Sequence, residues 1–139
     1  KLETVIADDP AVYAFLAMFY AARGNASDSV RIWNKLTEAQ RNEYPDLRKV
    51  MAQGLYERRF FPQSLSFAVE AGIDADAVAG AITNGGFETD VASPEDTFFG
   101  WRVPRGDGKL DVSIDRTVKS SGNRSMRLSF KGYSTPPSR

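Results

Sequence analysis

The spacing of apolar residues changes near Asn84, and this change constrains the fold more than any other feature of the sequence. Before it, apolar side chains recur three and four residues apart, as on one face of a helix. After it, apolar and polar residues alternate, as on a strand with one buried face, and Gly and Pro become frequent. The sequence therefore predicts an α+β fold, with a helical domain over residues 1–81 and a β segment over residues 82–139.

Cap residues mark where the helices begin and end. The first helix is predicted to start at Pro10, after Asp8 or Asp9 as N-cap, and to stop at Gly24. Its apolar residues run nearly all round, so we expect neighbours to sandwich it. Further helices are predicted after Asn25, after Pro45, over about residues 62–71 and over residues 74–81. The helix after Pro45 has an apolar stripe at Leu47, Val50, Met51 and Leu55.

Four short segments of the second part have the character of strands. Residues 82–88 and 98–103 are rich in Gly and aromatic residues, and residues 110–114 and 126–131 alternate in polarity. So few strands make only a partial antiparallel β-sandwich, with uncovered edges and apolar faces. We therefore expect self-association through the apolar side chains of the last two strands, which are Val112, Ile114, Leu128 and Phe130.

The composition excludes several classes of enzyme and of binding protein. The chain has no His and no Cys, which removes imidazole-based catalysis and the zinc sites built on these ligands. Its 18 basic and 18 acidic side chains give no net charge, whereas nucleic-acid binders usually carry a basic surplus. We predict a protein without catalytic activity, nucleic-acid binding or a cofactor. The lack of Cys does not fix the compartment.

No segment of the sequence resembles a membrane span or a targeting signal. The longest apolar run, residues 11–22, is too short to cross a bilayer, so no membrane span is predicted. Because the chain starts at Lys1 and has no signal-peptide pattern, we expect it to be a piece of a longer protein.

A repeat pattern lies in the helical part. With Pro10 as the first position of a unit of about 34 residues, the expected residue classes fall on Tyr13, Leu16, Ala17, Tyr20, Gly24, Ser29 and Trp33. A second, weaker copy has small residues at Ser64, Ala68 and Ala71. Over residues 10–72 the chain resembles the tetratricopeptide-repeat family, with Ala17 where the family prefers Gly and Ser29 where it prefers Ala.

The resemblance to tetratricopeptide repeats implies a function in protein binding. Such repeats stack so that the first helix of each lines a groove, which takes an extended peptide or a partner helix. Carried over to this chain, the residues that would reach the groove are Tyr13, Arg23, Arg48, Gln53 and Tyr56. The alternative is that these helices only cap and orient the β segment.

The β segment carries a second resemblance. Its motifs are Asn84-Gly85-Gly86-Phe87-Glu88, Gly100-Trp101 and Ser121-Gly122-Asn123-Arg124-Ser125-Met126-Arg127-Leu128. They resemble the opening of a carbohydrate-binding-module-type jelly roll with a galactose-binding-like fold, a sandwich of about eight strands that this segment is too short to complete. The resemblance implies a sugar-stacking platform at Phe98, Phe99 and Trp101, with core packing as the alternative. It also implies a Ca²⁺ site, with a solvated acidic loop as the alternative, at Glu88, Asp90, Glu95 and Asp96.

The two resemblances lead to one main prediction and one alternative. We predict a non-catalytic protein–protein interaction scaffold with a protein or peptide partner. The order of the two parts resembles bacterial proteins of envelope or exopolysaccharide systems, which implies a location in the cell envelope or periplasm. The alternative is a carbohydrate-binding accessory module that has a helical N-terminal extension and a polysaccharide ligand.

Overall fold

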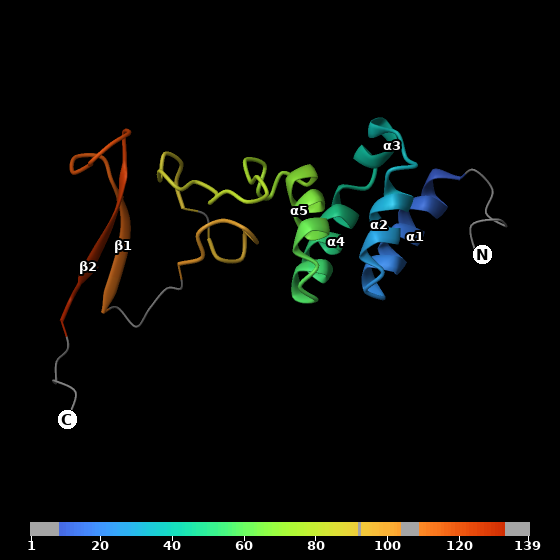
Figure 1. The fold of residues 1–139 in the computed structure, drawn as a ribbon, viewed down its shortest axis with the longest axis horizontal. Coiled ribbons are helices and arrows are strands. Elements are labelled where there is room, and N and C mark those ends of the chain that lie inside the picture. Colours follow the sequence, from blue (N-terminus) through green and yellow to red (C-terminus); the bar gives the residue numbers. More distant parts are fainter. Residues whose placement is uncertain (1–8, 92, 104–108, 133–139) are drawn as a thin grey trace, which may run out of the picture. The chain divides into compact units, whose positions relative to one another are not determined.

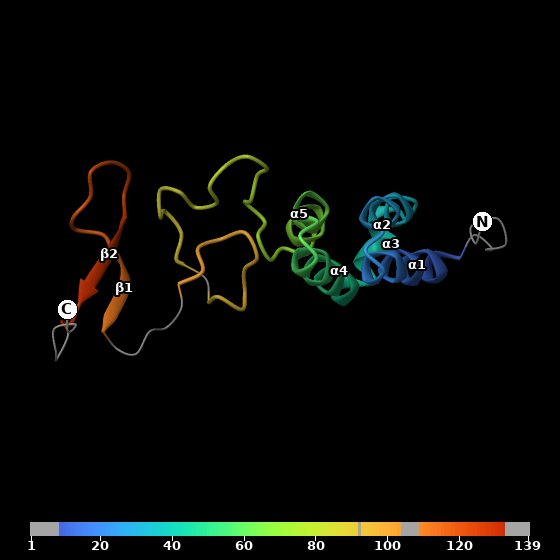
Figure 2. The same ribbon diagram turned by 60° about the horizontal axis from the view of Figure 1, so that its bottom comes forward.

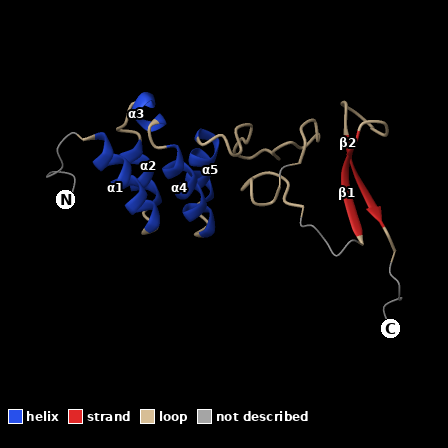
Figure 3. Ribbon diagram, turned by 180° about the vertical axis from the view of Figure 1, so that it is seen from behind, coloured by secondary structure: helices blue, strands red, loops and turns tan. Residues whose placement is uncertain are grey.

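The computed structural model describes residues 9–91, 93–103 and 109–132. In these residues five helices precede one antiparallel pair of strands (Figures 1 and 3). The helices are α1 (Pro10–Ala22), α2 (Ala26–Trp33), α3 (Glu38–Asn42), α4 (Pro45–Glu57) and α5 (Phe61–Glu70), and the strands are β1 (Leu110–Asp115) and β2 (Ser125–Phe130). The predicted α+β fold is confirmed. The chain divides into two compact units, Lys1–Ala79 and Gly80–Arg139, whereas the sequence predicts the division after residue 81.

Two stacked hairpins make up the helical unit. α1 packs against α2, and α4 packs against α5. α1 and α4 lie side by side in one layer, and α2 and α5 form the other layer (Figure 2). The start of α1 follows the prediction, because Asp9 accepts the Ala11 N–H at 2.9 Å and Pro10 occupies the first helical position.

The helical unit repeats its structure every 35 residues. α1 and α4 both contain 13 residues, and Pro45 at the start of α4 lies 35 positions after Pro10 at the start of α1. The turns that follow also match, since Gly24 and Arg59 both have left-handed backbone, with φ of +79° and +66°. The period is therefore one residue longer than the roughly 34 residues of a tetratricopeptide unit.

Residues at matching positions of the two copies form the core. The matching pairs that are fully buried are Ala17 with Ala52, Ser29 with Ser64, Ile32 with Phe67 and Trp33 with Ala68. Small residues let the paired helices approach closely, and the larger Ile and Phe fill the space between them. Ser64 Oγ donates to the Ala52 carbonyl at 2.7 Å. Ser29 Oγ lies 3.7 Å from the sulfur of Met51, which joins the first hairpin to α4.

A polar cluster around Glu70, which we call the Glu70 cluster, ties the hairpins together. The buried indole N–H of Trp33 donates to Glu70 Oε2 at 3.0 Å. Arg41 Nη1 lies 3.3 Å from Glu70 Oε1. Arg48 donates to the Glu70 carbonyl at 2.9 Å and to Asn42 Oδ1 at 2.6 Å. Side chains from α2, α3 and α4 thus converge on one residue of α5.

Arg48 Nε also lies 3.8 Å from Glu70 Oε1. Replacing Glu70 by Ala is expected to lower the free energy of unfolding by about 2 kcal/mol, because the buried Arg48 and Trp33 would lose this carboxylate as a partner. Glu70→Gln keeps an acceptor for Trp33 and is expected to cost less. Chemical denaturation followed by helical circular dichroism measures both. The matched control is Glu57→Ala, an exposed carboxylate of α4. Equal losses for Glu57→Ala and Glu70→Ala would contradict the role given to the cluster.

The left-handed turn residues give a second prediction. A non-Gly residue with left-handed backbone costs about 1–2 kcal/mol of folded-state stability. Replacing it by Gly removes this cost but also makes the unfolded chain more flexible, which offsets part of the gain. Arg59→Gly is therefore expected to raise the free energy of unfolding by about 1 kcal/mol, and Gly24→Ala to lower it by a similar amount. A Cβ at Gly24 would meet the Phe60 ring at an ordinary 3.5 Å, so backbone strain alone is tested there. Urea denaturation measures the free energy of unfolding of both variants. A lower value for Arg59→Gly than for the wild type would refute the argument.

β1 and β2 form a two-stranded ladder with one apolar and one polar face. The opposed pairs on the apolar face are Leu110 with Phe130, Val112 with Leu128 and Ile114 with Met126. The predicted strands over residues 110–114 and 126–131 are confirmed. Phe130 at one end of the ladder is 75% exposed. Self-association through this face stays a prediction.

Two other predicted strands do not form. Residues 82–88 and 98–103 are turns and loops. Asn84 has a φ of +48°, and its side chain bonds the N–H and the carbonyl of Thr89 at 3.1 and 2.9 Å, which closes a loop. Thr97 Oγ1 accepts a backbone N–H three residues on, at 2.7 Å. Side chains thus bond backbone groups in or directly after the two segments, in competition with strand pairing.

Two predictions for the helical part are also wrong. Residues 74–81, which the sequence predicts to form a helix after α5, form turns instead, and Gly80 within them has a φ of +80°. Val50 was expected in the buried stripe of α4 but is 53% exposed, while Met51 and Leu55 of that stripe are buried. The buried side of α4 is therefore narrower than its apolar pattern suggests.

Candidate functional site

Four large apolar side chains are exposed on the first helices of the two hairpins: Val12, Phe15 and Phe19 on α1, and Val50 on α4. α1 has no charged residue, and its Phe15 and Phe19, one turn apart, are 53% and 44% exposed. Val50 of α4, 35 positions after Phe15, is exposed to the same extent as Phe15. Because Phe15 and Val50 hold the same position in the repeat, they face the same side of the α1–α4 layer. We call Phe15, Phe19 and Val50 the apolar face.

Aromatic and cationic neighbours frame the apolar face. The rings of Phe15 and Tyr44 meet edge-on with centroids 6.3 Å apart. The guanidinium of Arg23 lies 5.0 Å from the centroid of the Phe19 ring. Arg58 donates to the carbonyl of the last α1 residue at 2.7 Å. Two arginines therefore lie at the C-terminal end of α1, where they complement the helix dipole and border the apolar face.

Two of the five residues predicted to line a groove are arginines with opposite surroundings. Arg23 is exposed and contacts the apolar face through Phe19. Arg48 is 8% exposed and held by Glu70 and Asn42. The structure therefore places Arg23 beside the apolar face and Arg48 between helices, where its guanidinium supports the stack.

The other three predicted groove residues contact different neighbours. The ammonium of Lys35 lies 5.2 Å from the centroid of the Tyr13 ring. Gln53 Nε2 donates to the carboxylate one turn on, at 3.0 Å, on the exposed side of α4. Tyr56 meets the Phe61 ring edge-on at 5.4 Å. These three contacts involve Lys35, Glu57 and Phe61, which lie outside the apolar face.

Sequence reasoning missed Phe15 and Phe19 because every side of α1 is apolar. Charged residues on one side of a helix reveal its exposed face, and α1 offers no such signal. The expectation that neighbours sandwich this helix is wrong for these two residues. Correct alignment of the 35-residue copies, which pairs Phe15 with Val50, is the signal that points to a shared surface.

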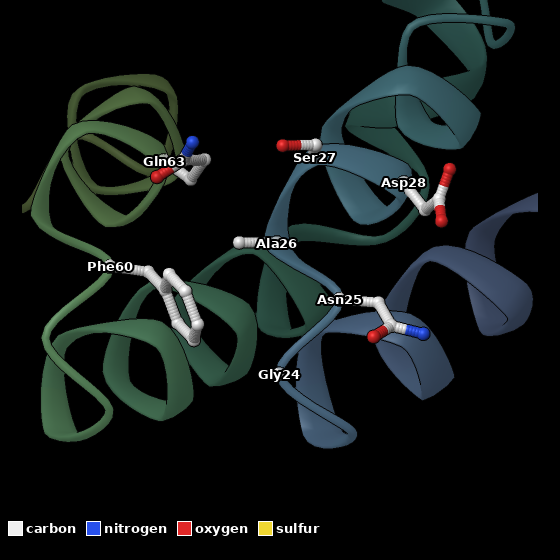
Figure 4. Close-up of a pocket in the computed structure, with 7 residues that line it drawn as sticks. All are labelled: Gly24, Asn25, Ala26, Ser27, Asp28, Phe60 and Gln63. Carbon is white, nitrogen blue, oxygen red and sulfur yellow. The ribbon is translucent and has the colours of Figure 1, made fainter.

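A shallow hollow of about 290 Å³ lies beside the turn between α1 and α2. Its lining consists of Gly24, Asn25, Ala26, Ser27, Asp28, Phe60 and Gln63 (Figure 4). Asp28 is the one charged residue of this lining, and its Oδ1 already pairs with Arg31 Nη2 at 2.9 Å. A single paired carboxylate does not make the acid–base pair of a glycosidase.

The aromatic residues of the predicted sugar platform are half-buried in the second unit. Trp101 Nε1 donates to the Asn84 carbonyl at 3.1 Å, and its ring centroid lies 4.9 Å from that of Phe87. Phe87 therefore occupies part of the Trp101 surface. Phe98 and Phe99 are likewise half-buried. The structure brings Trp101 against the Asn84–Thr89 loop that replaces the first predicted strand.

Two of the four carboxylates predicted as Ca²⁺ ligands hold the loop between β1 and β2. Glu88 Oε1 accepts the Asn123 N–H at 2.8 Å, which lowers the pKa of Glu88. The same oxygen would clash with a Cβ at position 122, which Gly122 lacks. Asp90 pairs with Arg124 at 2.8 Å. In the described part of the chain, no group of three or more acidic side chains is arranged to hold a metal ion.

Asp115 closes the turn after β1. Its Oδ1 accepts from the hydroxyl and N–H of Thr117 at 2.6 and 2.7 Å, and from the Val118 N–H at 3.1 Å. These bonds, the Thr117 hydroxyl first, stabilise the charged form and lower the pKa of Asp115 from 3.8 to about 2.

This turn is expected to depend on pH. Because the pKa in the folded state lies below that of the unfolded chain, the stabilisation is complete above about 3.8 and is lost as pH falls through about 2. The amide signals of Thr117 and Val118 should titrate with a midpoint near 2 in NMR spectra. The transition should vanish in Asp115→Asn. A midpoint near 3.8 would contradict the hydrogen-bond geometry.

Comparisons with known proteins give no relative for this chain: no family model, no curated protein and no solved structure matches it. The tetratricopeptide and carbohydrate-module resemblances therefore stay predictions. None of the helices in the described residues is both long and apolar enough to span a membrane.

Proposed function

We propose that the helical unit is a non-catalytic protein-interaction module, and that its apolar face binds apolar side chains of a partner. The observation that carries this proposal is the exposure of Phe15 and Phe19 on a helix without a single charge. Burying one such side chain is worth about 1.5–3 kcal/mol. Clustered exposed aromatic residues are typical of interaction surfaces, whereas isolated ones are not.

The geometry favours a helical partner. Phe15 and Phe19 are four residues apart, so they present two rings along one line of α1. An amphipathic helix with apolar residues at the same spacing matches this line. Arg23 and Arg58 at the end of α1 favour an acidic residue after the apolar stripe of the partner. The bacterial envelope or polysaccharide system that the resemblance implies is part of the same proposal.

The test is selection of helical peptides from a display library against the folded chain, followed by calorimetric titration of the peptides obtained. Phe15→Ser and Val50→Ser are each expected to weaken binding at least about tenfold, or about 1.4 kcal/mol. The matched control is Val78→Ser, an exposed apolar residue of the same unit outside the apolar face. Peptides that respond to Val78→Ser and ignore Phe15→Ser would refute the proposal.

A second candidate function is that of a carbohydrate-binding accessory module. It rests on Phe98, Phe99 and Trp101, which are half-buried and retain some exposed surface. A panel of oligosaccharides titrated into the same chain separates the two functions. Millimolar or tighter binding that is lost in Trp101→Ala, and kept in the hairpin control Phe130→Ala, would favour this candidate over the interaction module.

A further inference from the structure

The internal repeat shows which side of a first helix meets a neighbouring hairpin. On α4, the side that carries Met51 and Leu55 is buried, and Met51 contacts Ser29 of the first hairpin. The α1 residues 35 positions earlier are Leu16 and Tyr20, and both are only half-buried. The side of α1 that carries Leu16 and Tyr20 therefore corresponds to the side by which α4 stacks on its neighbour, but it is more exposed to solvent.

A third residue extends this side of α1. Tyr13 occupies the position of Arg48, and it too is half-buried where its counterpart is buried. We call Tyr13, Leu16 and Tyr20 the end face. Leu16 follows Phe15 by one residue, which is a turn of about 100° around the helix axis. The end face is therefore a different side of α1 from the apolar face.

The opposite end of the stack has a different chemistry. Three Ala positions are buried in the first hairpin and carry larger residues in the second: Ala14, Ala21 and Ala26 become Lys49, Tyr56 and Phe61. Lys49 and Phe61 are exposed. Positions buried in the first copy and exposed in the second are those that the second hairpin covers. With a charge and two aromatic rings there, the second hairpin is a poor acceptor for another repeat.

We propose that the end face binds the end face of a second copy of the chain, and that this makes a two-fold symmetric dimer. The proposal extends the stack, because the side of α1 involved corresponds, 35 residues earlier, to the side by which α4 stacks on the first hairpin. Pairing of like with like closes the assembly, since the poor acceptor at the other end disfavours a head-to-tail chain. α1 has no charge, so its two copies meet without repulsion.

The size of the end face sets the expected strength. A helix of 13 residues is about 20 Å long, so the contact lies at the small end of protein interfaces. We therefore expect a reversible dimer with a dissociation constant in the micromolar range. Lys35, whose exposed ammonium lies over the Tyr13 ring, brings a positive charge to the end face of each copy, which limits the strength of the dimer.

Sedimentation velocity of the whole chain over a concentration series tests the proposal. The wild-type chain is expected to pass from monomer to dimer as its concentration rises. Leu16→Lys and Tyr20→Lys each place two like charges across the two-fold axis, and each is expected to weaken the dimer at least about tenfold. Phe15→Lys on the apolar face and Phe130→Thr on the β hairpin are matched controls that should dimerise like the wild type.

Circular dichroism and thermal unfolding establish that each variant is folded, and Leu16→Gln replaces Leu16→Lys if the charge unfolds the unit. A chain that stays monomeric throughout the series overturns the proposal. Loss of the dimer in Phe130→Thr, with Leu16→Lys unaffected, also overturns it and assigns self-association to the strands. Peptide binding by the apolar face is measured separately, so either proposal can fail while the other stands.

Discussion

The contact of Trp33 with α5 is the interaction on which the helical unit depends. Its ring is almost fully buried and meets Phe67 edge-on at 6.0 Å, while its N–H is satisfied by Glu70. This contact fixes the second hairpin on the first, and the order of the stack then determines which helix sides reach solvent. The end face is a consequence of that order, because α1 is the outermost first helix of the described stack, whereas the apolar face includes Val50 of α4 and follows the repeat itself.

The two hairpins have the same backbone arrangement but differ in the side chains on their surfaces. Buried positions such as Ala17 and Ala52 keep small residues, since helix spacing depends on them. Phe19 of α1, in contrast, corresponds to Gly54 of α4. The hairpins are thus equivalent as structural units and unequal as surfaces, and the more apolar surface belongs to the first.

The sequence predicted the parts of the fold that local chemistry decides. Pro10, Pro45 and Gly24 mark helix ends, and the alternation in β1 and β2 marks a hairpin. It failed where a side chain competes with backbone pairing, as Asn84 does in the first predicted strand. The short α3 was missed although Thr37 and Gln40 form a capping box. The apolar face could not be predicted, because exposure of an all-apolar helix depends on tertiary neighbours.

The Glu88 carboxylate and the missing side chain of Gly122 have a consequence for sequence change. An oxygen of Glu88 lies so close to Gly122 that the Cβ of any other residue at position 122 would clash with it, and Gly122 also has a φ of +66°. A larger residue at 122 would displace Glu88 from the Asn123 N–H and release the loop between the strands. Positions 88 and 122 should therefore vary together among relatives of this chain, with Glu at the first only where Gly stands at the second.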